Sequence, residues 1–168
     1  GTLFLDEIGE LRLDMQVKLL RAIQEGEVDP VGAKRPVKVD IRLVSATNRN
    51  LLQQVNEGKF REDLFYRLNV FPIVLPPLRD RREDIPSLVT HFIRRFAVEE
   101  NKKIVGIDPA AIEMLINFPW PGNIRQLENT VFRAVVLCDD GCLHTGDFPQ
   151  VASQLGIPNA DPRTFPSF

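Results

Sequence analysis

Two neighbouring carboxylates follow a short apolar run at the start of the chain. Leu3, Phe4 and Leu5 have the composition of a buried strand, and Asp6 and Glu7 come directly after them. If that strand belongs to a parallel sheet, the two acids lie at its carboxyl end, which is where such sheets bind ligands. Carboxylates at that position can hold a hydrated Mg²⁺ ion and polarise a water molecule for attack on a phosphate. An acid pair that only caps the next loop is the alternative.

A second polar group, Thr47 and Asn48, ends the next strand pattern along the chain. The threonine hydroxyl and the asparagine amide can hydrogen-bond a phosphate group or an attacking water. The same residue types often form local turns by bonding to nearby backbone groups. Taken alone, the local turn is the favoured interpretation of this pair.

Two arginines lie in the segment 60–68, six residues apart. Leucines spaced by four predict that this segment is a short helix with one side against a core. Arg61 and Arg67 are then more than one and a half turns apart and can contact different parts of one anionic ligand. Pairing with Glu62 and Asp63 on a solvated surface is the alternative, and it is the usual arrangement of exposed charges.

A further arginine, Arg125, falls in the first turn of a predicted helix that follows the turn-forming segment 119–122. A helix N-terminus and a guanidinium group both favour a nearby anion. The alternative is that Arg125 pairs with Glu128, one turn further along the helix. The segment is therefore a candidate anion site.

The elements that position these side chains follow from the hydrophobic periodicity. Strand patterns and helical patterns alternate in the first half of the chain, at 2–5, 14–25, 37–43, 51–57, 60–68 and 70–75. This alternation indicates a parallel sheet, so residues 1–77 are predicted to form part of an α/β subdomain. Residues 78–150 contain three helical patterns and are predicted to form an all-helical lid. Residues 151–168 contain prolines and little periodicity, so we interpret them as a linker.

Composition excludes several classes of protein. The chain has 168 residues, of which 43% are hydrophobic and 26% charged, as in ordinary globular domains. Its formal net charge of −2 argues against a protein dominated by contacts with a nucleic-acid backbone. No apolar run approaches the roughly 20 residues of a membrane span. Two cysteines cannot form a disulfide framework, so the composition predicts a protein of the reducing cytoplasm.

Taken together, these stretches resemble the AAA+ ATPase domain of the sigma-54-dependent transcription activators, the bacterial enhancer-binding proteins. Residues 1–8 are similar to the family's Walker B motif, and 60–69, 75–79 and 120–125 match other family motifs in order and spacing. The resemblance covers residues 1 to about 150. It implies an α/β fold in which part of an AAA+ P-loop NTPase core, with a parallel sheet, is followed by a small all-helical lid subdomain.

The resemblance implies a role in ATP hydrolysis for the polar strand ends. Asp6 would coordinate Mg²⁺, and Glu7 would activate the hydrolytic water. Thr47 and Asn48 would form sensor I, which detects the γ-phosphate of ATP. ATP and Mg²⁺ are therefore the implied cofactors of the full-length protein.

The resemblance also implies that the arginines act on nucleotides from two directions. Arg61 and Arg67 match the family's arginine fingers, which act on ATP held by the neighbouring subunit and raise the rate by about 10³ to 10⁵ in related enzymes. Arg125 would be sensor II and would contact the nucleotide of its own subunit from the lid. The implied partners are sigma-54 RNA polymerase, further copies of the chain in a hexameric ring, and DNA through a separate C-terminal domain, with no membrane partner.

The loop 27–37 corresponds to the family's pre-sensor I loop, which supports the loop that contacts sigma-54. Many members carry a basic residue and two glycines here, whereas this chain has Pro30, Val31, Gly32 and Ala33. We therefore assign no individual contacts in this loop.

Two family motifs do not occur in these 168 residues. One is the phosphate-binding loop G-x-x-x-x-G-K-[ST], or Walker A motif, and the other is the GAFTGA loop that contacts sigma-54. Because the chain starts inside a strand pattern at Gly1, we expect it to be a fragment with both motifs upstream. We also expect the isolated chain neither to bind ATP tightly nor to hydrolyse it. The predicted strand 70–75 would lack its family neighbour, so the fragment is expected to exchange strands, oligomerise or rearrange there.

Two alternatives remain open. One is an AAA+ ATPase that acts on another client, such as a DNA-processing motor or a chelatase. A GAFTGA-like insertion upstream would favour the sigma-54 activators over this alternative. The other is a non-enzymatic DNA-binding or protein-binding module made of the helices between residues 84 and 140. Major-groove readers need several basic residues at the start of the recognition helix, and the last helix has few, which disfavours this module.

Overall fold

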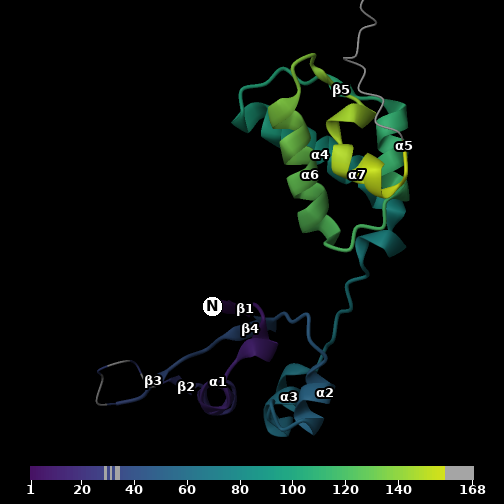
Figure 1. Ribbon diagram of the computed structural model, residues 1–168. Coiled ribbons are helices and arrows are strands. Elements are labelled where there is room, and N and C mark those ends of the chain that lie inside the picture. The colour runs from purple at the N-terminus through teal and green to yellow at the C-terminus, as the bar shows by residue number, and fades with distance from the viewer. Residues whose placement is uncertain (29, 31, 33–34, 158–168) are drawn as a thin grey trace, which may run out of the picture. The chain divides into compact units, whose positions relative to one another are not determined.

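The chain divides into two compact units, Gly1–Val74 and Leu75–Phe168 (Figure 1). The structure is a computed structural model, and it describes residues 1–28, 30, 32 and 35–157. Part of the predicted pre-sensor I loop, at residues 29, 31, 33 and 34, therefore lies outside the described residues.

The first unit is built on two parallel strands. Strand β1 (Thr2–Leu5) pairs with β4 (Arg42–Ser45), in a register that sets Leu5 opposite Ser45 (Figure 1). The pairing continues past both strands, because the Ala46 amide donates to the Leu5 carbonyl at 2.9 Å and the Ile8 amide donates to the Ala46 carbonyl at 3.0 Å. The predicted parallel pairing of these two strands is confirmed, and their carboxyl ends are held side by side.

The predicted strand 37–43 is divided between two sheets. Residues Val37–Lys38 form β3, which pairs antiparallel with β2 (Glu27–Val28), whereas residues from Arg42 onward belong to β4. Between them the Val39 amide donates to the Gly26 carbonyl at 2.7 Å. One continuous alternating pattern thus serves two strand partners, which periodicity by itself does not reveal.

The first unit also contains a 3₁₀ turn and three helices, while β1 and β4 themselves stay largely exposed. They are the 3₁₀ turn η1 (Ile8–Glu10), α1 (Leu13–Glu25), α2 (Leu51–Asn56) and α3 (Glu62–Leu68). Helix α1 ends at Gly26, whose φ of 65° is the left-handed conformation that favours glycine, as predicted. Ile8, Leu20, Phe60 and Leu64 form the buried core of this unit.

The predicted third strand, 70–75, is wrong. The structure has no strand there, and Phe71 and Val74 are 83% and 88% exposed. Within the described residues the β1–β4 sheet has two strands, so the backbone of this segment has no ladder to join. An apolar, β-branched run forms a strand only where a neighbour pairs with its amides and carbonyls.

The second unit is helical. Its helices are α4 (Ile85–Glu99), α5 (Pro109–Asn117), α6 (Asn123–Leu137) and α7 (Pro149–Gln154), with the 3₁₀ turns η2 (Leu78–Asp80), η3 (Arg82–Asp84) and η4 (Thr145–Asp147). A short parallel pair, β5 (Gly106–Ile107) and β6 (Cys142–Leu143), joins two of its loops. The Asp108 carboxylate accepts from the Ala110 amide at 2.9 Å and so caps the start of α5. The core is centred on Trp120, Leu127 and Phe148.

The start of the predicted linker 151–168 is helical and buried. Val151 and Ala152 lie in α7 and are each 2% exposed, and α7 packs against α5. Pro149 at the first helical position favours this start, and the short apolar pair provides enough contact to join the core. The expectation of a linker does not hold for this stretch, and residues 158–168 lie outside the described residues.

No helix in the described ranges is long and apolar enough to cross a bilayer.

Candidate functional site

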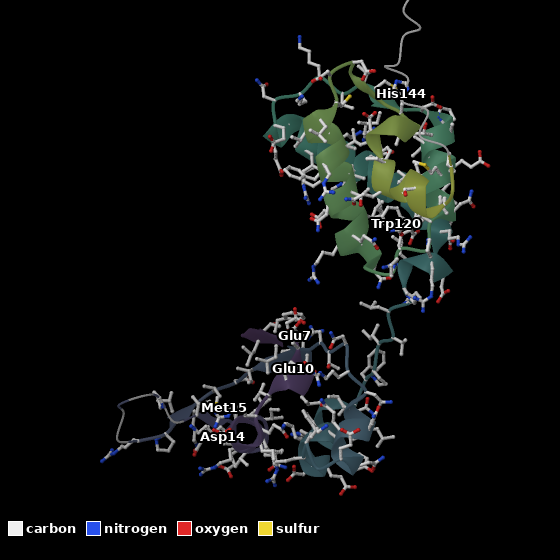
Figure 2. The ribbon with its side chains drawn as sticks, in the orientation of Figure 1. Glu7, Glu10, Asp14, Met15, Trp120 and His144 are labelled. Atoms are coloured by element: carbon white, nitrogen blue, oxygen red, sulfur yellow. The ribbon has the colours of Figure 1, made fainter. Side chains whose placement is uncertain are left out.

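The first part of the candidate site is the turn after β1. The Asp6 carboxylate accepts from the Glu7 amide at 2.8 Å, and Glu7 itself has φ 52° and ψ 41°. This left-handed conformation is uncommon for a glutamate and turns the chain sharply from β1 into η1. Both carboxylates are exposed, and Figure 2 labels Glu7 at this turn and Glu10 just beyond it.

The second part is the polar step after β4. Because Leu5 is opposite Ser45, the residues Asp6, Glu7, Thr47 and Asn48 leave the same end of the two-stranded sheet. We call these four residues the β1–β4 edge. The Thr47 hydroxyl also accepts from the Arg49 amide at 3.1 Å, so the local turn considered from the sequence is present as well.

The β1–β4 edge is braced by contacts that the sequence reasoning missed. A Cβ on Gly9 would lie 2.9 Å from the Thr47 hydroxyl and 3.2 Å from the Gln54 Oε1, so only glycine allows this close approach. The Gln54 side-chain amide donates to the Gly9 carbonyl at 3.1 Å, and Arg49 pairs with Glu10. A glycine two residues after the acid pair was the one local signal of this packing.

Arg61 is paired within its own helix. It is the N-cap residue of α3, and its Nε and Nη2 atoms donate to the two Asp63 carboxylate oxygens at 3.0 and 2.6 Å. These hydrogen bonds lower the pKa of Asp63 below its usual value and raise the pKa of Arg61. The alternative considered from the sequence, pairing with a neighbouring acid, is therefore present for Arg61.

Arg67 lies in the last turn of the same helix and is exposed. In the part of the chain that the structure describes, its side chain makes no ion pair. Six residues of helix separate it from Arg61 by about 9 Å along the axis. The two arginines thus lie at opposite ends of α3, as the spacing predicted.

In the second unit, Arg125 lies on the exposed side of the first turn of α6. The predicted alternative, a pair with Glu128, is not observed, because Glu128 pairs with Arg95 from α4. Arg125 lines an open hollow of about 360 Å³ together with Gly122, Gln126, Asn129, Thr130, Arg133 and Gln150. Two guanidinium groups and no carboxylate line this hollow, so it favours an anion.

The turn before α6 connects two of the motifs noted in the sequence. The Asn123 side chain accepts from the Leu78 amide at 2.9 Å, and Leu78 is fully buried. Asn123 is the first residue of α6, has a φ of 52°, and holds the 75–79 motif through this hydrogen bond. The buried Trp120 donates from Nε1 to the Leu115 carbonyl at 2.8 Å and anchors the other side of the turn.

Metal binding by protein groups alone is not indicated. Among the described residues, no group of three or more His, Cys, Asp or Glu side chains is arranged to hold a metal ion. Any divalent cation at the β1–β4 edge would therefore depend on oxygen ligands from water or from a bound phosphate.

Comparisons with known proteins identify both units. The family described as "Sigma-54 interaction domain" matches residues 1–74, and the family described as "AAA+ ATPase lid domain" matches residues 79–162. The second match assigns the helices to the AAA+ lid family, which disfavours the independent DNA-binding or protein-binding module.

Individual relatives agree with these families. The chain is 52% identical over 158 residues to the transcriptional regulatory protein ZraR of Escherichia coli K12, covering 94% of this chain and 36% of that protein. It is 53% identical over 149 residues to the regulatory protein AtoC of the same strain, covering 89% of this chain and 32% of AtoC. The crystal structure of NtrX from Brucella abortus in complex with ATP matches with 40% identity and a TM-score of 0.84, covering 92% of this chain and 36% of that one.

The chain spans about a third of the length of these relatives. One matched family covers the unit that contains the β1–β4 edge, and the other covers the unit that contains Arg125. The chain therefore belongs to the AAA+ family of sigma-54-dependent transcription activators.

Proposed function

We propose that this chain is part of a transcription activator that hydrolyses ATP in a hexameric ring and uses the energy to remodel sigma-54 RNA polymerase bound at promoters. The observation that carries the proposal is the β1–β4 edge, where the register of two parallel strands gathers two carboxylates, a hydroxyl and an amide. These groups can hold a magnesium ion, orient a water and hydrogen-bond a phosphate, which are part of what phosphoryl transfer to water needs. DNA binding is assigned to a separate domain, and the bacterial cytoplasm follows from the polymerase as partner.

Asp6 fits the magnesium ion that accompanies ATP. Mg²⁺ in such sites takes one or two protein carboxylates and fills its other positions with water and phosphate oxygens. The edge offers an exposed carboxylate on a turn held by the Glu7 amide. When bound there, the ion would neutralise charge on the phosphates.

Glu7 and the sensor residues act on the attacking water and the γ-phosphate. The Glu7 carboxylate orients the water and accepts its proton, which is the role of a general base. Thr47 and Asn48 hydrogen-bond the γ-phosphate from the neighbouring strand. Because these groups come from adjacent strand ends, loss of the γ-phosphate would change hydrogen bonds on both strands together.

The arginines supply positive charge from outside the edge. Arg61 and Arg67 act as fingers on ATP bound by the next subunit, so Arg61 must exchange Asp63 for a phosphate when subunits meet. Arg125, from the hollow on α6, contacts the nucleotide of its own subunit. Each charge-assisted hydrogen bond of this kind is stronger in a site that excludes water than on an open surface.

We further propose that the 168-residue chain has no ATPase activity of its own. The sequence contains no G-x-x-x-x-G-K-[ST] loop, which is the glycine-rich turn that surrounds the β- and γ-phosphates in ATPases of this type. Metal-dependent ATP turnover by the purified chain would contradict this.

The test of the proposed function is Glu7→Gln in the longer protein that contains this chain. Nucleotide binding is expected to remain, because glutamine preserves size and hydrogen bonding, while phosphate release falls by about 10²- to 10⁴-fold with the loss of the base. Calorimetry with ATP and a phosphate-release assay measure the two effects separately. Glu10→Gln is the matched control, since Glu10 lies in the next turn and pairs with Arg49. Equal loss of turnover in both variants would refute the role of Glu7.

A further inference from the structure

Helix α1 carries a glutamine, Gln16, whose side chain is completely buried. The first unit has one other buried polar side chain among its described residues, Gln54, which is 7% exposed. Burying a side-chain amide costs free energy of folding unless its N–H donors and its oxygen acceptor all form hydrogen bonds. The partners of Gln16 therefore indicate what it does.

Gln16 connects three backbone groups from two other segments. Its Nε2 donates to the Leu11 carbonyl at 2.7 Å and to the Lys59 carbonyl at 3.1 Å. Its Oε1 accepts from the Arg61 amide at 2.9 Å. Both amide hydrogens and the carbonyl oxygen are thus used, and all the partners are backbone groups.

Two of these partners lie on either side of Phe60, which is 2% exposed in the core. Gln16 and the Phe60 side chain together hold the backbone of 59–61 against α1. Arg61 follows the buried Phe60 and is exposed, and its side chain makes no hydrogen bond that caps α3. The Gln54 carbonyl also accepts from the Lys59 and Phe60 amides, at 2.8 and 3.2 Å, but the Arg61 amide itself donates to Gln16. Gln16 is therefore the side chain that holds the Arg61 amide in place.

The third partner connects the same amide to the β1–β4 edge. Leu11 is the residue that ends η1, and η1 begins directly after Glu7. The Gln16 side chain therefore links the end of the acid-bearing turn, at the Leu11 carbonyl, to the backbone amide of Arg61. The three hydrogen bonds are 2.7 to 3.1 Å long and the Gln16 side chain is fully buried, so this link has little freedom to move.

We propose that Gln16 is a positioning residue that sets where Arg61 projects and couples it to the acid-bearing turn of the same subunit. The inference rests on the proposed function, in which Arg61 serves the nucleotide of the neighbouring subunit. In that arrangement Gln16 connects the site that a subunit contains to the finger that it offers. Its loss would impair catalysis in the neighbour while leaving the subunit's own acids in place.

The first experiment tests the geometry in the 168-residue chain, independently of ATPase activity. Hydrogen exchange of the Arg61 amide is measured by NMR in the unmodified chain, in Gln16→Met and in Gln54→Met. Methionine has a similar length and no amide, and Gln54→Met removes the other buried amide without touching Arg61. We expect exchange at Arg61 to become about tenfold faster or more in Gln16→Met, as for one lost hydrogen bond, and to be unchanged in Gln54→Met. Unchanged exchange in Gln16→Met would overturn the proposal.

The second experiment tests the positioning of the Arg61 finger in the longer, ring-forming protein. Gln16→Met subunits have intact acids and a displaced finger, whereas Glu7→Gln subunits have an intact finger and no base. Each variant alone is expected to turn over ATP slowly, and mixed rings are expected to recover turnover at least several-fold, because one subunit supplies what the other lacks. A purely structural defect would not be rescued in this way.

Mixed rings of Arg61→Ala and Glu7→Gln separate failure of this inference from failure of the proposed function. If these rings do not recover turnover, the assignment of Arg61 as a finger is wrong. If they recover and the Gln16→Met mixture does not, the positioning role of Gln16 is wrong. Should Gln16→Met not fold, Gln16→Asn, which keeps the amide but shortens the side chain by one methylene, is measured in the same assays with the same expectations.

Discussion

At the scale of single residues, the site is shaped by close approach and by local pairing. Gly9 lets the turn after β1 lie against Thr47, and Glu7 accepts a left-handed backbone conformation that most residues avoid. Arg61 is held by Asp63 in the chain as it stands. Strain at Glu7 and pairing at Arg61 both place reactive groups in defined positions before any ligand binds.

The Arg61–Asp63 pair makes a prediction about pH. The pKa of Asp63 is lowered in the folded chain. The ion pair therefore stabilises the fold at pH values above the ordinary pKa of an aspartate, and this stabilisation is lost as the pH falls through the lowered pKa of Asp63. The pair is about two-fifths exposed, so the gain in stability is small. NMR titration of the Arg61 Nε–H signal is expected to show a midpoint below the usual 3.8 of aspartate. Asp63→Asn should abolish the transition, and a midpoint at or above the usual value would contradict the pairing.

At the scale of elements, the candidate site residues are positioned mainly by hydrogen bonds in the turns next to the strands and helices. The parallel pair β1 and β4 has four residues in each strand, yet two further backbone hydrogen bonds continue it to Ala46 and Ile8. In the helical unit, Asn123 joins η2 to α6 through the Leu78 amide, which orients the helix that carries Arg125. Periodicity predicted most of the helices, because each buries one side against a core. It did not predict this link, because the partner of a side chain depends on the tertiary arrangement.

Replacement of Asn123 should destabilise the helical unit. Asn123→Ala removes the hydrogen bond to Leu78 and leaves a left-handed backbone without a residue suited to it, for an expected loss of about 1–3 kcal/mol in the free energy of unfolding. Asn123→Gly keeps the backbone conformation and should lose less. The fluorescence of Trp120, the single tryptophan and a fully buried one, reports unfolding of this unit.

The matched control for that prediction is Asn129→Ala, an exposed asparagine on the same helix. It should change stability by no more than about 0.5 kcal/mol. If Asn123→Ala and Asn129→Ala have equal effects, the link to Leu78 contributes nothing to stability.

At the scale of the whole molecule, the two units are folded around separate cores, and the apolar side chains of the segment 70–75, which spans the boundary between the units, are exposed. Residues 70–75 were expected to form a strand. In the structure they are exposed and pair with no neighbouring strand. Exposed β-forming segments favour association between chains.

The chain is therefore expected to self-associate through 70–75. Sedimentation should show association that increases with concentration, and the double change of Phe71→Lys and Ile73→Lys should reduce it, since both residues are more than 70% exposed. Val105→Lys, at a residue that is 90% exposed outside the segment, is the control and should leave association unchanged. A chain that stays monomeric at every concentration would show that this segment does not mediate contacts.

The sequence by itself determined most of the helices, the two-acid strand end and the family, because these depend on local spacing and on ordered motifs. It also determined that Asp6, Glu7, Thr47 and Asn48 share one edge, since parallel strands end on the same side. Only the tertiary structure decided that Gln16 holds Arg61, that Asn123 holds Leu78 and that 70–75 has no strand partner. The physical reason is common to all three: each depends on which backbone amides and carbonyls remain to be paired once the chain has folded.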